Sequence, residues 1–174
     1  EVPTPTSQIM FRTTLEQGQF LNSFFTLNFS KRFNASVAYT GLRSLGKFRR
    51  SLVSQGYFRT TFNYRSKSEN YRIRGHIATH DLLNEQSGGL TDTSLNAFLT
   101  DDPNFTDRAR LDVTLTGTET FFEGKRLFIE QDYRLLKSQD STKTKDFSNL
   151  KVGHSFLTES KNFEFRQQGV DTDF

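Results

Sequence analysis

The sequence predicts an all-β fold made of long antiparallel strands, each with one apolar face and one polar face. The first observation is alternation with a period of two, seen where Leu21, Phe25 and Leu27 alternate with polar neighbours. The second is length, because several alternating segments reach about 11 residues or more, whereas globular strands are mostly about 5–6 residues long. The third is that no apolar run exceeds three residues, which excludes a spanning helix of roughly 20 residues.

Alternation and turn residues predict about nine strands along the chain. In order, they lie near residues 6–16, 20–31, 34–43, 55–66, 69–80, 107–117, 125–137, 148–157 and 162–168. A transmembrane strand needs only about 9–11 residues, half of them apolar. Strands of this kind therefore favour a membrane barrel over a soluble sandwich.

Large apolar residues define one side of these strands. The second strand contributes Leu21 to Phe29, the fourth and fifth contribute aromatic and Ile residues, and the sixth contributes Leu111 to Leu115. We therefore expect the lipid-facing residues to be Leu21, Phe25, Leu27, Phe29, Phe58, Phe62, Ile73, Ile77, Leu111, Val113 and Leu115.

Arginines occupy the alternate positions of the fourth to seventh strands. If the apolar side meets lipid, they point into the lumen, and the lumen-lining candidates are Arg59, Arg72, Arg74, Arg108, Arg110 and Arg134. Asp112, Glu130 and Asp132 share that side. Two roles therefore remain open, a charged lining that selects solutes and an Arg–carboxylate network that braces adjacent strands.

The connections alternate between short and long. Short polar ones lie at 31–33, 66–68 and 158–161, and longer ones at 44–54, 81–106 and 138–147. Bacterial outer-membrane barrels have short periplasmic turns and long extracellular loops. The pattern predicts an antiparallel transmembrane β-barrel of the outer-membrane type, with 81–106 and 138–147 extracellular and the turns near Lys31, Lys67 and Ser160 periplasmic.

Aromatic residues come in pairs at the predicted short connections. The pairs are Phe29 with Phe33, Tyr64 with Tyr71, Phe121 with Phe122, and Phe156 with Phe163. Aromatic girdles at the membrane interfaces have this form. The alternative is that these rings only pack the core of a soluble sheet.

The remaining candidates for chemistry favour structural roles. His76 and His80 share a strand face but lie about 13 Å apart, too far for one zinc ion. The aspartates of the 81–106 connection have no EF-hand spacing and fit a turn, and the sequons at Asn28, Asn34 and Asn104 fit chance occurrence. With no Cys, no nucleophile motif and a net charge of only +3, we expect no enzyme activity, no cofactor or metal, and no nucleic-acid partner.

A family resemblance rests on three stretches, FNASVAYTGLRSLGKF (33–48), GYFRTTFNYRSKSENYRIRGHIATHD (56–81) and DDPNFTDRARLDV (101–113). Weaker similarity runs through 124–135 and 152–165. The chain resembles the "putative porin" family of Bacteroidetes-type outer membranes, whose members are several times longer. The resemblance implies that residues 1–174 form a single β-barrel segment, an incomplete wall, without a separate soluble domain. Glu1 in place of Met, and the polar run before Phe174, lead us to expect a mature or cut-down chain.

The predicted function is passive diffusion of small hydrophilic solutes through the outer membrane of a Gram-negative bacterium. The predicted partners are outer-membrane lipid, the remainder of the barrel and the solutes, with anionic solutes favoured by the arginine excess. Two alternatives stay open. One is a structural or partner barrel in an outer-membrane complex, and the other is a soluble extracellular glycan-binding β-sheet protein.

Overall fold

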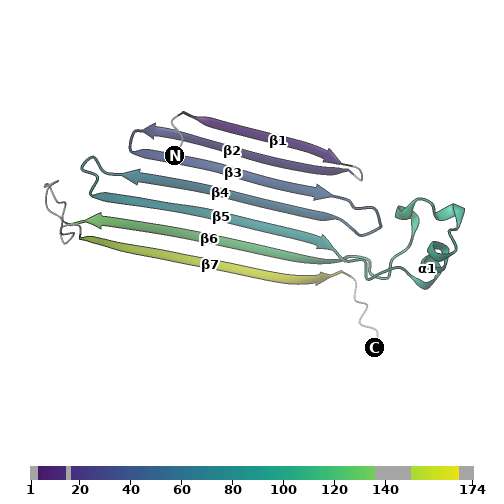
Figure 1. Ribbon diagram of the computed structural model, residues 1–174. Coiled ribbons are helices and arrows are strands. Elements are labelled where there is room, and N and C mark those ends of the chain that lie inside the picture. Colours follow the sequence, from purple (N-terminus) through teal and green to yellow (C-terminus); the bar gives the residue numbers. More distant parts are fainter. Residues whose placement is uncertain (1–3, 15–16, 136–149, 169–174) are drawn as a thin grey trace, which may run out of the picture.

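The chain forms one antiparallel sheet of seven strands that follow one another in sequence order (Figure 1). The computed structural model describes residues 4–14, 17–135 and 150–168. The strands are β1 (Thr6–Thr14), β2 (Gly18–Ser30), β3 (Phe33–Ser44), β4 (Val53–Arg65), β5 (Tyr71–Glu85), β6 (Thr118–Arg134) and β7 (Lys151–Gln167). The all-β antiparallel prediction is confirmed.

The sheet has two distinct rims. The turn rim carries the connections 31–32, between β2 and β3, and 66–70, between β4 and β5. The loop rim carries the connections 45–52, between β3 and β4, and 86–117, between β5 and β6. The 66–70 turn is closed by the Tyr71 N–H, which donates to Ser66 Oγ at 3.1 Å. The Arg65 N–H donates to the Arg32 carbonyl at 2.9 Å and so joins the end of β4 to the 31–32 turn.

The predicted sixth strand at 107–117 is wrong. These residues belong to the 86–117 loop, which holds helix α1 (Asp92–Leu99) and two 3₁₀ turns, Pro103–Phe105 and Arg108–Arg110. The Asp107 carboxylate accepts the Ala109 N–H at 3.0 Å, which stabilises a turn where alternation alone predicted extended chain. Only Val113 retains strand character, in an isolated bridge to Leu90.

The gap between the predicted strands 107–117 and 125–137, and the predicted connection 158–161, both lie inside strands. Residues 118–124 form the start of β6, and 158–161 lie in the middle of β7, where Ser160 pairs with Lys125. The predicted strands 148–157 and 162–168 are therefore one strand, and the strand count falls from nine to seven. Both stretches are rich in polar residues, but 158–161 has no Gly, Pro or Asn-Gly, and the single Gly124 lies within the β6 pairing.

The β6–β7 connection also differs from the prediction. β6 ends and β7 begins at the turn rim, where the Leu135 N–H donates to the Leu150 carbonyl at 2.8 Å. The predicted placement of this connection beside the 81–106 segment is wrong, because seven sequential antiparallel strands put alternate connections on opposite rims. Residues 138–147 themselves lie outside the described residues.

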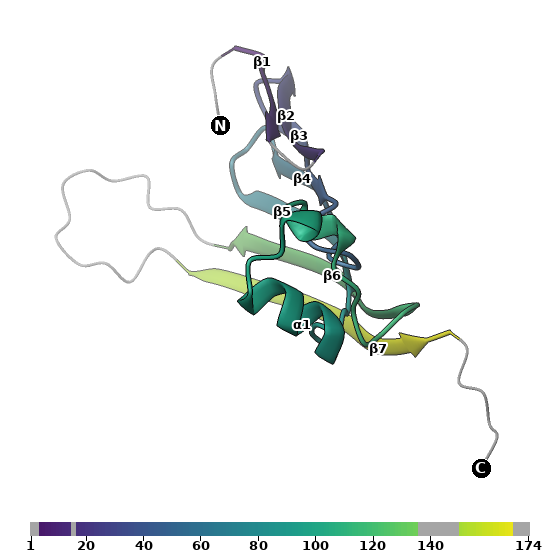
Figure 2. The ribbon, with the colours of Figure 1, turned by 90° about the vertical axis from the view of Figure 1, so that its right-hand side faces the viewer.

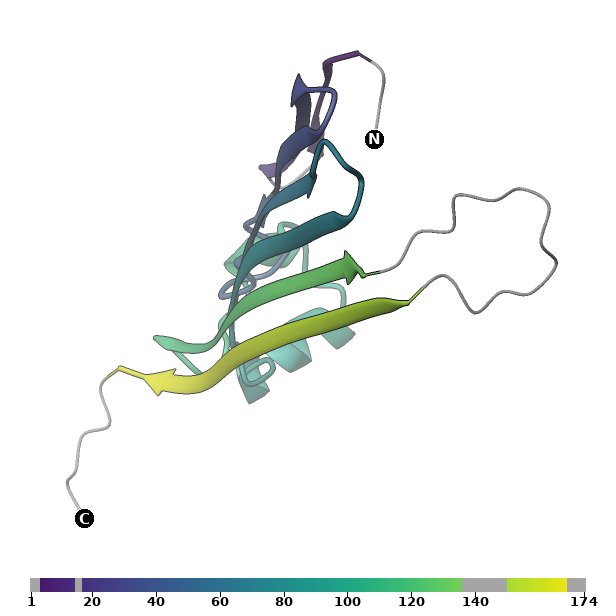
Figure 3. The same ribbon diagram turned by 90° about the vertical axis from the view of Figure 1, so that its left-hand side faces the viewer.

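The sheet is a single twisted layer. Views from the loop rim and from the turn rim show the strands rotating steadily from β1 to β7 (Figures 2 and 3). Among the described residues, the buried apolar side chains are only Ala78 and Leu111. No helix in the described ranges is long and apolar enough to cross a membrane. The strands therefore present both faces outward, and β1 and β7 present two open edges.

Candidate functional site

The strand pairing divides the side chains between two faces. Directly paired residues of neighbouring strands point to the same face, and successive residues of a strand point to opposite faces. The aromatic face carries Ile9, Phe11, Leu21, Phe25, Leu27, Val37, Tyr39, Phe58, Phe62, Tyr64, Tyr71, Ile73, Ile77, Leu127, Ile129, Tyr133, Val152 and Phe156. The opposite arginine face carries Arg59, Arg72, Arg74, Arg126 and Arg134, together with Glu130, Asp132 and Glu159.

The structure brings together most of the residues that the sequence assigned to each side. The candidates Leu21, Phe25, Leu27, Phe58, Phe62, Ile73 and Ile77 all share the aromatic face. Phe29 lies at a register irregularity in β2, with its ring centroid 5.5 Å from that of Phe33. The candidates Arg59, Arg72, Arg74 and Arg134 share the arginine face.

Five candidates do not lie on the sheet. Leu111 is fully buried inside the 86–117 loop, with 0% exposed, so its prediction as a lipid-facing residue is wrong. Val113 and Leu115 lie in the same loop, and so do Arg108 and Arg110, which form a 3₁₀ turn. The Arg108 guanidinium lies 4.3 Å from the centroid of the Phe98 ring. The alternation of 107–117 imitates a strand without forming one.

The apolar band on the aromatic face ends along an oblique line toward the loop rim. From β1 to β7, the band itself ends at Phe11, Leu21, Tyr39, Phe58, Ile77, Leu127 and Phe156, and beyond it the paired Leu83 and Phe121 stand apart among charged residues. The pairs Phe11–Leu21, Tyr39–Phe58 and Ile77–Leu127 are each in register. From one pair to the next, the limit moves two residues away from the loop rim. Leu21 pairs with Gly41 but the band on β3 ends at Tyr39, Phe58 pairs with Thr79 but the band on β5 ends at Ile77, and Leu127 pairs with Thr158 but the band on β7 ends at Phe156.

This drift gives the inclination of the strands relative to the band. The limit descends by six residues over six strand steps, or one residue per strand. With a rise of about 3.4 Å per residue and a strand spacing of about 4.8 Å, the strands are inclined by about 35° to the perpendicular of the band. Strands of transmembrane barrels tilt by about 35–45°. The apolar band is therefore placed as a bilayer would cross a barrel wall.

Aromatic rings border the band on both sides. Toward the turn rim they are Phe29, Phe33, Tyr64, Tyr71 and Tyr133, and toward the loop rim they are Phe11, Tyr39, Phe58 and Phe156. On β2 the band runs from Leu21 to Phe29, which is about 27 Å along the strand and about 22 Å after correction for the inclination. Outer-membrane barrels carry an apolar band about 25 Å tall between aromatic girdles.

The sequence-based aromatic pairs are only partly placed as predicted. Phe29 with Phe33 and Tyr64 with Tyr71 do border turns of the turn rim. Phe121 and Phe122 lie within β6 on opposite faces, and Phe156 and Phe163 lie within β7 on opposite faces. The prediction of a ring pair at every short turn is therefore wrong for the last two pairs.

Beyond the band, the polarity of β5, β6 and β7 is inverted. Near the loop rim their aromatic face carries the apolar pair Leu83 and Phe121, surrounded by Asp81, Glu85, Glu119, Glu123, Lys125, Asn162, Glu164 and Arg166. Ion pairs join Lys125 to Glu123 at 2.7 Å and Arg166 to Glu164 at 2.7 Å. Charged side chains are costly in the bilayer interior. This end of the three strands is therefore suited to water and not to lipid.

The arginines on the arginine face have different surroundings. Arg74 Nη2 lies 2.6 Å from Glu130 Oε2, and Arg72 Nε lies 2.8 Å from Asp132 Oδ2, each across directly paired positions of β5 and β6. Arg59 has no carboxylate partner among the described residues. Two of the candidate lining arginines thus brace adjacent strands, whereas the charge of Arg59 is not neutralised by a neighbour in the described sheet.

The long antiparallel strands and the apolar band agree with the family to which the chain is similar. A family model described as "Putative porin" matches residues 1–174. The chain belongs to this porin family. Neither the search of curated proteins nor the search of solved structures gives a match. Membership confirms the resemblance seen in the sequence, and it supports a porin-like role, a channel without catalytic chemistry and an outer-membrane location.

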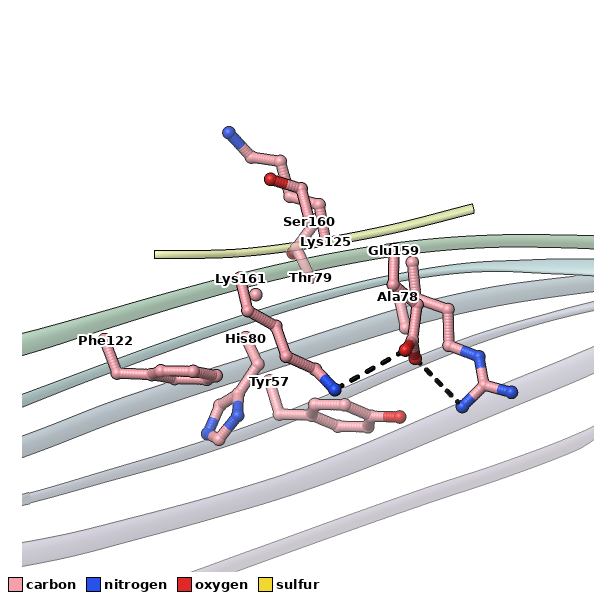
Figure 4. A pocket seen from close by; sticks show the side chains of 11 residues that line it. Tyr57, Ala78, Thr79, His80, Phe122, Lys125, Glu159, Ser160 and Lys161 are labelled. Carbon is pink, nitrogen blue, oxygen red and sulfur yellow. Dashed lines mark hydrogen bonds and ion pairs between the residues drawn. The ribbon is translucent and has the colours of Figure 1, made fainter. Parts of the chain in front are cut away.

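The arginine face of this porin-family chain also holds a pocket that the sequence did not reveal. It has a volume of about 190 Å³ and is lined by residues of β4, β5, β6 and β7 (Figure 4). Tyr57, His80 and Phe122 form one side, and Arg126, Glu159 and Lys161 form the other. Local sequence patterns do not reveal it because they place Phe122 and Glu159–Lys161 in turns. The correct strand limits would have placed all six side chains on one face.

Histidines in this porin-family sheet have structural surroundings. The His76 ring packs against Phe128 at a centroid distance of 5.4 Å, and His80 packs between Tyr57 and Phe122. Within the described residues no group of three or more His, Cys, Asp or Glu side chains is arranged to hold a metal ion.

Proposed function

We propose that the chain forms part of the wall of an outer-membrane channel through which small hydrophilic solutes diffuse passively. The aromatic face contacts lipid, and the arginine face lines a water-filled lumen. The observation that carries this proposal is the oblique apolar band, because its inclination of about 35°, its height and its two aromatic borders all match a transmembrane barrel. A soluble single-layer sheet would leave the same apolar band exposed to water.

The orientation in the membrane follows from the rims. Short turns of outer-membrane barrels face the periplasm, and the longer loops face outward. We propose that the turn rim is periplasmic, because the two tightest connections, 31–32 and 66–70, lie there, and that the 45–52 and 86–117 loops are extracellular. The longer connection 135–150 is then also periplasmic. The water-suited ends of β5, β6 and β7 then project beyond the bilayer on the extracellular side.

Closure of the wall requires more strands than these seven. β1 and β7 run in the same direction, so they cannot pair with each other in an antiparallel ladder. An odd number of further strands between them gives a fully antiparallel barrel with an even strand number, as in bacterial outer-membrane proteins. We propose that such strands cover both open edges, which would otherwise favour aggregation.

The experiment is reconstitution of the purified protein into planar lipid bilayers. A channel gives stepwise increases in current, and liposomes that contain it swell in solutions of small neutral solutes. Insertion without current would contradict the channel and favour a structural barrel. Extraction from cells in buffer alone, without detergent, would instead favour a soluble sheet.

A further inference from the structure

The pocket on the arginine face lies at the level where the lipid-facing band ends. Gly124 is directly paired with His80 on one side and with Lys161 on the other. Lys125, on the opposite face, is the first charged residue of β6 beyond the band. If the arginine face lines the lumen, as proposed above, this pocket lies at the extracellular mouth of the channel.

Three rings form the apolar side of the pocket. The His80 ring meets Tyr57 at a centroid distance of 5.9 Å and an interplanar angle of 81°, and meets Phe122 at 5.6 Å and 68°. The edge-on His80 ring thus lies between the other two rings (Figure 4). His80 Nε2 is buried and has no hydrogen-bond partner among the described residues, so the ring contributes to the pocket chiefly through its apolar packing.

Charged groups form the opposite side. The Glu159 carboxylate lies 3.4 Å from Arg126 Nη1 and 3.4 Å from Lys161 Nζ, and Figure 4 shows Lys161 and Glu159 above the rings. Hydrogen-bond donors and acceptors therefore alternate along one edge of the pocket. Glu159 is shared between two cations, so the three groups carry a net charge of +1 and offer both donors and an acceptor.

Glycine at position 124 leaves the space between the two sides open. A Cβ atom there would lie 3.3 Å from Phe122 Cε1 and 3.9 Å from His80 Cβ. Any larger side chain would press on the Phe122 ring and occupy the pocket. The absence of a side chain on β6, between Lys161 and His80, is what creates the cavity.

We propose that this pocket is a binding subsite for a neutral saccharide ring. A pyranose has a flat C–H surface that packs on aromatic rings, and its rim of hydroxyl groups both donates and accepts hydrogen bonds. The three rings match the first property, and the Arg126–Glu159–Lys161 edge matches the second. A cationic solute would be repelled by Arg126 and Lys161, whereas an uncharged polyhydroxylated ring can accept hydrogen bonds from both cations and donate to Glu159.

The experiment measures saccharide block of the current through the reconstituted protein. Maltotriose is the probe, and sorbitol, which has hydroxyl groups but no ring, is the control solute. We expect saturable block by maltotriose and none by sorbitol. Phe122→Leu and Tyr57→Leu keep apolar volume but remove a ring, and each should raise the half-saturating concentration of maltotriose about tenfold or more. Gly124→Leu should abolish the block by filling the pocket.

A matched control is Phe24→Leu, which removes a ring from the same face outside the pocket and should leave maltotriose block unchanged. Equal block in all the variants, or stronger block by tryptophan than by maltotriose, would overturn the assignment. Calorimetric titration of maltotriose into the detergent-solubilised protein separates this inference from the channel proposal. Binding without current would support the subsite and contradict the channel, whereas current without binding would do the reverse.

Discussion

A single residue step decides whether a side chain of this sheet meets the apolar band or the arginine face. Val37 lies within the band, 45% exposed, between Phe25 and Thr60. Ser36 lies on the opposite face, where its hydroxyl is 2.7 Å from that of Thr61. The two positions are neighbours on the same strand, but in the proposed wall Val37 meets lipid and Ser36 meets water.

Arginine substitution at these two positions tests the proposed solvents. Val37→Arg should reduce the free energy of unfolding in lipid by about 2–4 kcal/mol, because the charge enters the bilayer near its midplane. Ser36→Arg should cost only about 1 kcal/mol, chiefly through the lost hydrogen bond. The measurement is urea unfolding in lipid vesicles. Equal costs at the two positions would show that the aromatic face does not meet lipid.

Charge selectivity should depend on Arg59 more than on the paired arginines. Arg59→Gln removes a positive charge with no described carboxylate partner and should shift the reversal potential toward cations. Replacing Arg74 and Glu130 together with Gln removes no net charge and should leave the reversal potential nearly unchanged. The shift should shrink in high salt, because the Debye length falls from about 10 Å at 0.1 M to about 3 Å at 1 M. Equal shifts in both variants would contradict this distinction.

At the scale of elements, the 86–117 loop is organised around one buried apolar side chain. Leu111 is 0% exposed, and the following Asp112 N–H donates to the hydroxyl of buried Ser94 in α1 at 2.8 Å. Asp112 also pairs with Arg49 of the 45–52 loop. These contacts attach α1 to the loop rim and to the neighbouring loop.

Leu111→Ala should therefore loosen the loop while leaving the sheet intact. The loss of a buried Leu side chain costs about 2–5 kcal/mol, more than a short loop helix withstands. Limited proteolysis of the reconstituted protein should show new cleavage between residues 92 and 110. Leu99→Ala, at a position that is 70% exposed, is the matched control and should not change the cleavage. An unchanged pattern in Leu111→Ala would mean that other contacts hold the loop.

The sequence predicted strands well where both signals, alternation and turn chemistry, agreed. β2 to β4 were placed within two residues at each end because each alternates and ends at a polar turn, whereas β5 extends five residues beyond its predicted end. The 107–117 segment alternates as well, but Asp107 caps a 3₁₀ turn and Leu111 is buried by contacts distant in sequence. The 158–161 segment is polar on both faces because β7 leaves the apolar band there. Neither tertiary effect is visible in local periodicity.

At the scale of the whole molecule, the two rims predict a fixed orientation in the cell. The chain has no cysteine, so single cysteines can report on exposure. Asn104→Cys in the 86–117 loop should react with a membrane-impermeant maleimide on intact cells, and Lys67→Cys in a short turn should react only after the outer membrane is opened. Labelling in the reverse order would invert the proposed topology.

The face on which a residue lies depends only on the strand register. The tilt of the strands in the membrane depends on how the apolar residues are distributed over all seven strands. A limit that descends one residue per strand requires strands inclined by about 35° if the bilayer is flat across the wall. A soluble sheet has no reason to keep such a limit straight. The inclination is thus a property of the whole sheet, and it is set by the residues at which the band ends on each strand, such as Tyr39, Ile77 and Phe156.

Polarised infrared spectroscopy of the protein in oriented bilayers measures this inclination directly. The dichroism of the amide I band should give strands tilted by about 35–45° from the membrane normal. Ile77→Ser with Leu127→Ser lowers the limit on β5 and β6 and should increase the tilt or impair insertion, whereas Thr79→Ser, just beyond the limit, should do neither. Strands without preferred orientation, or parallel to the normal, would mean that the oblique band does not mark the bilayer.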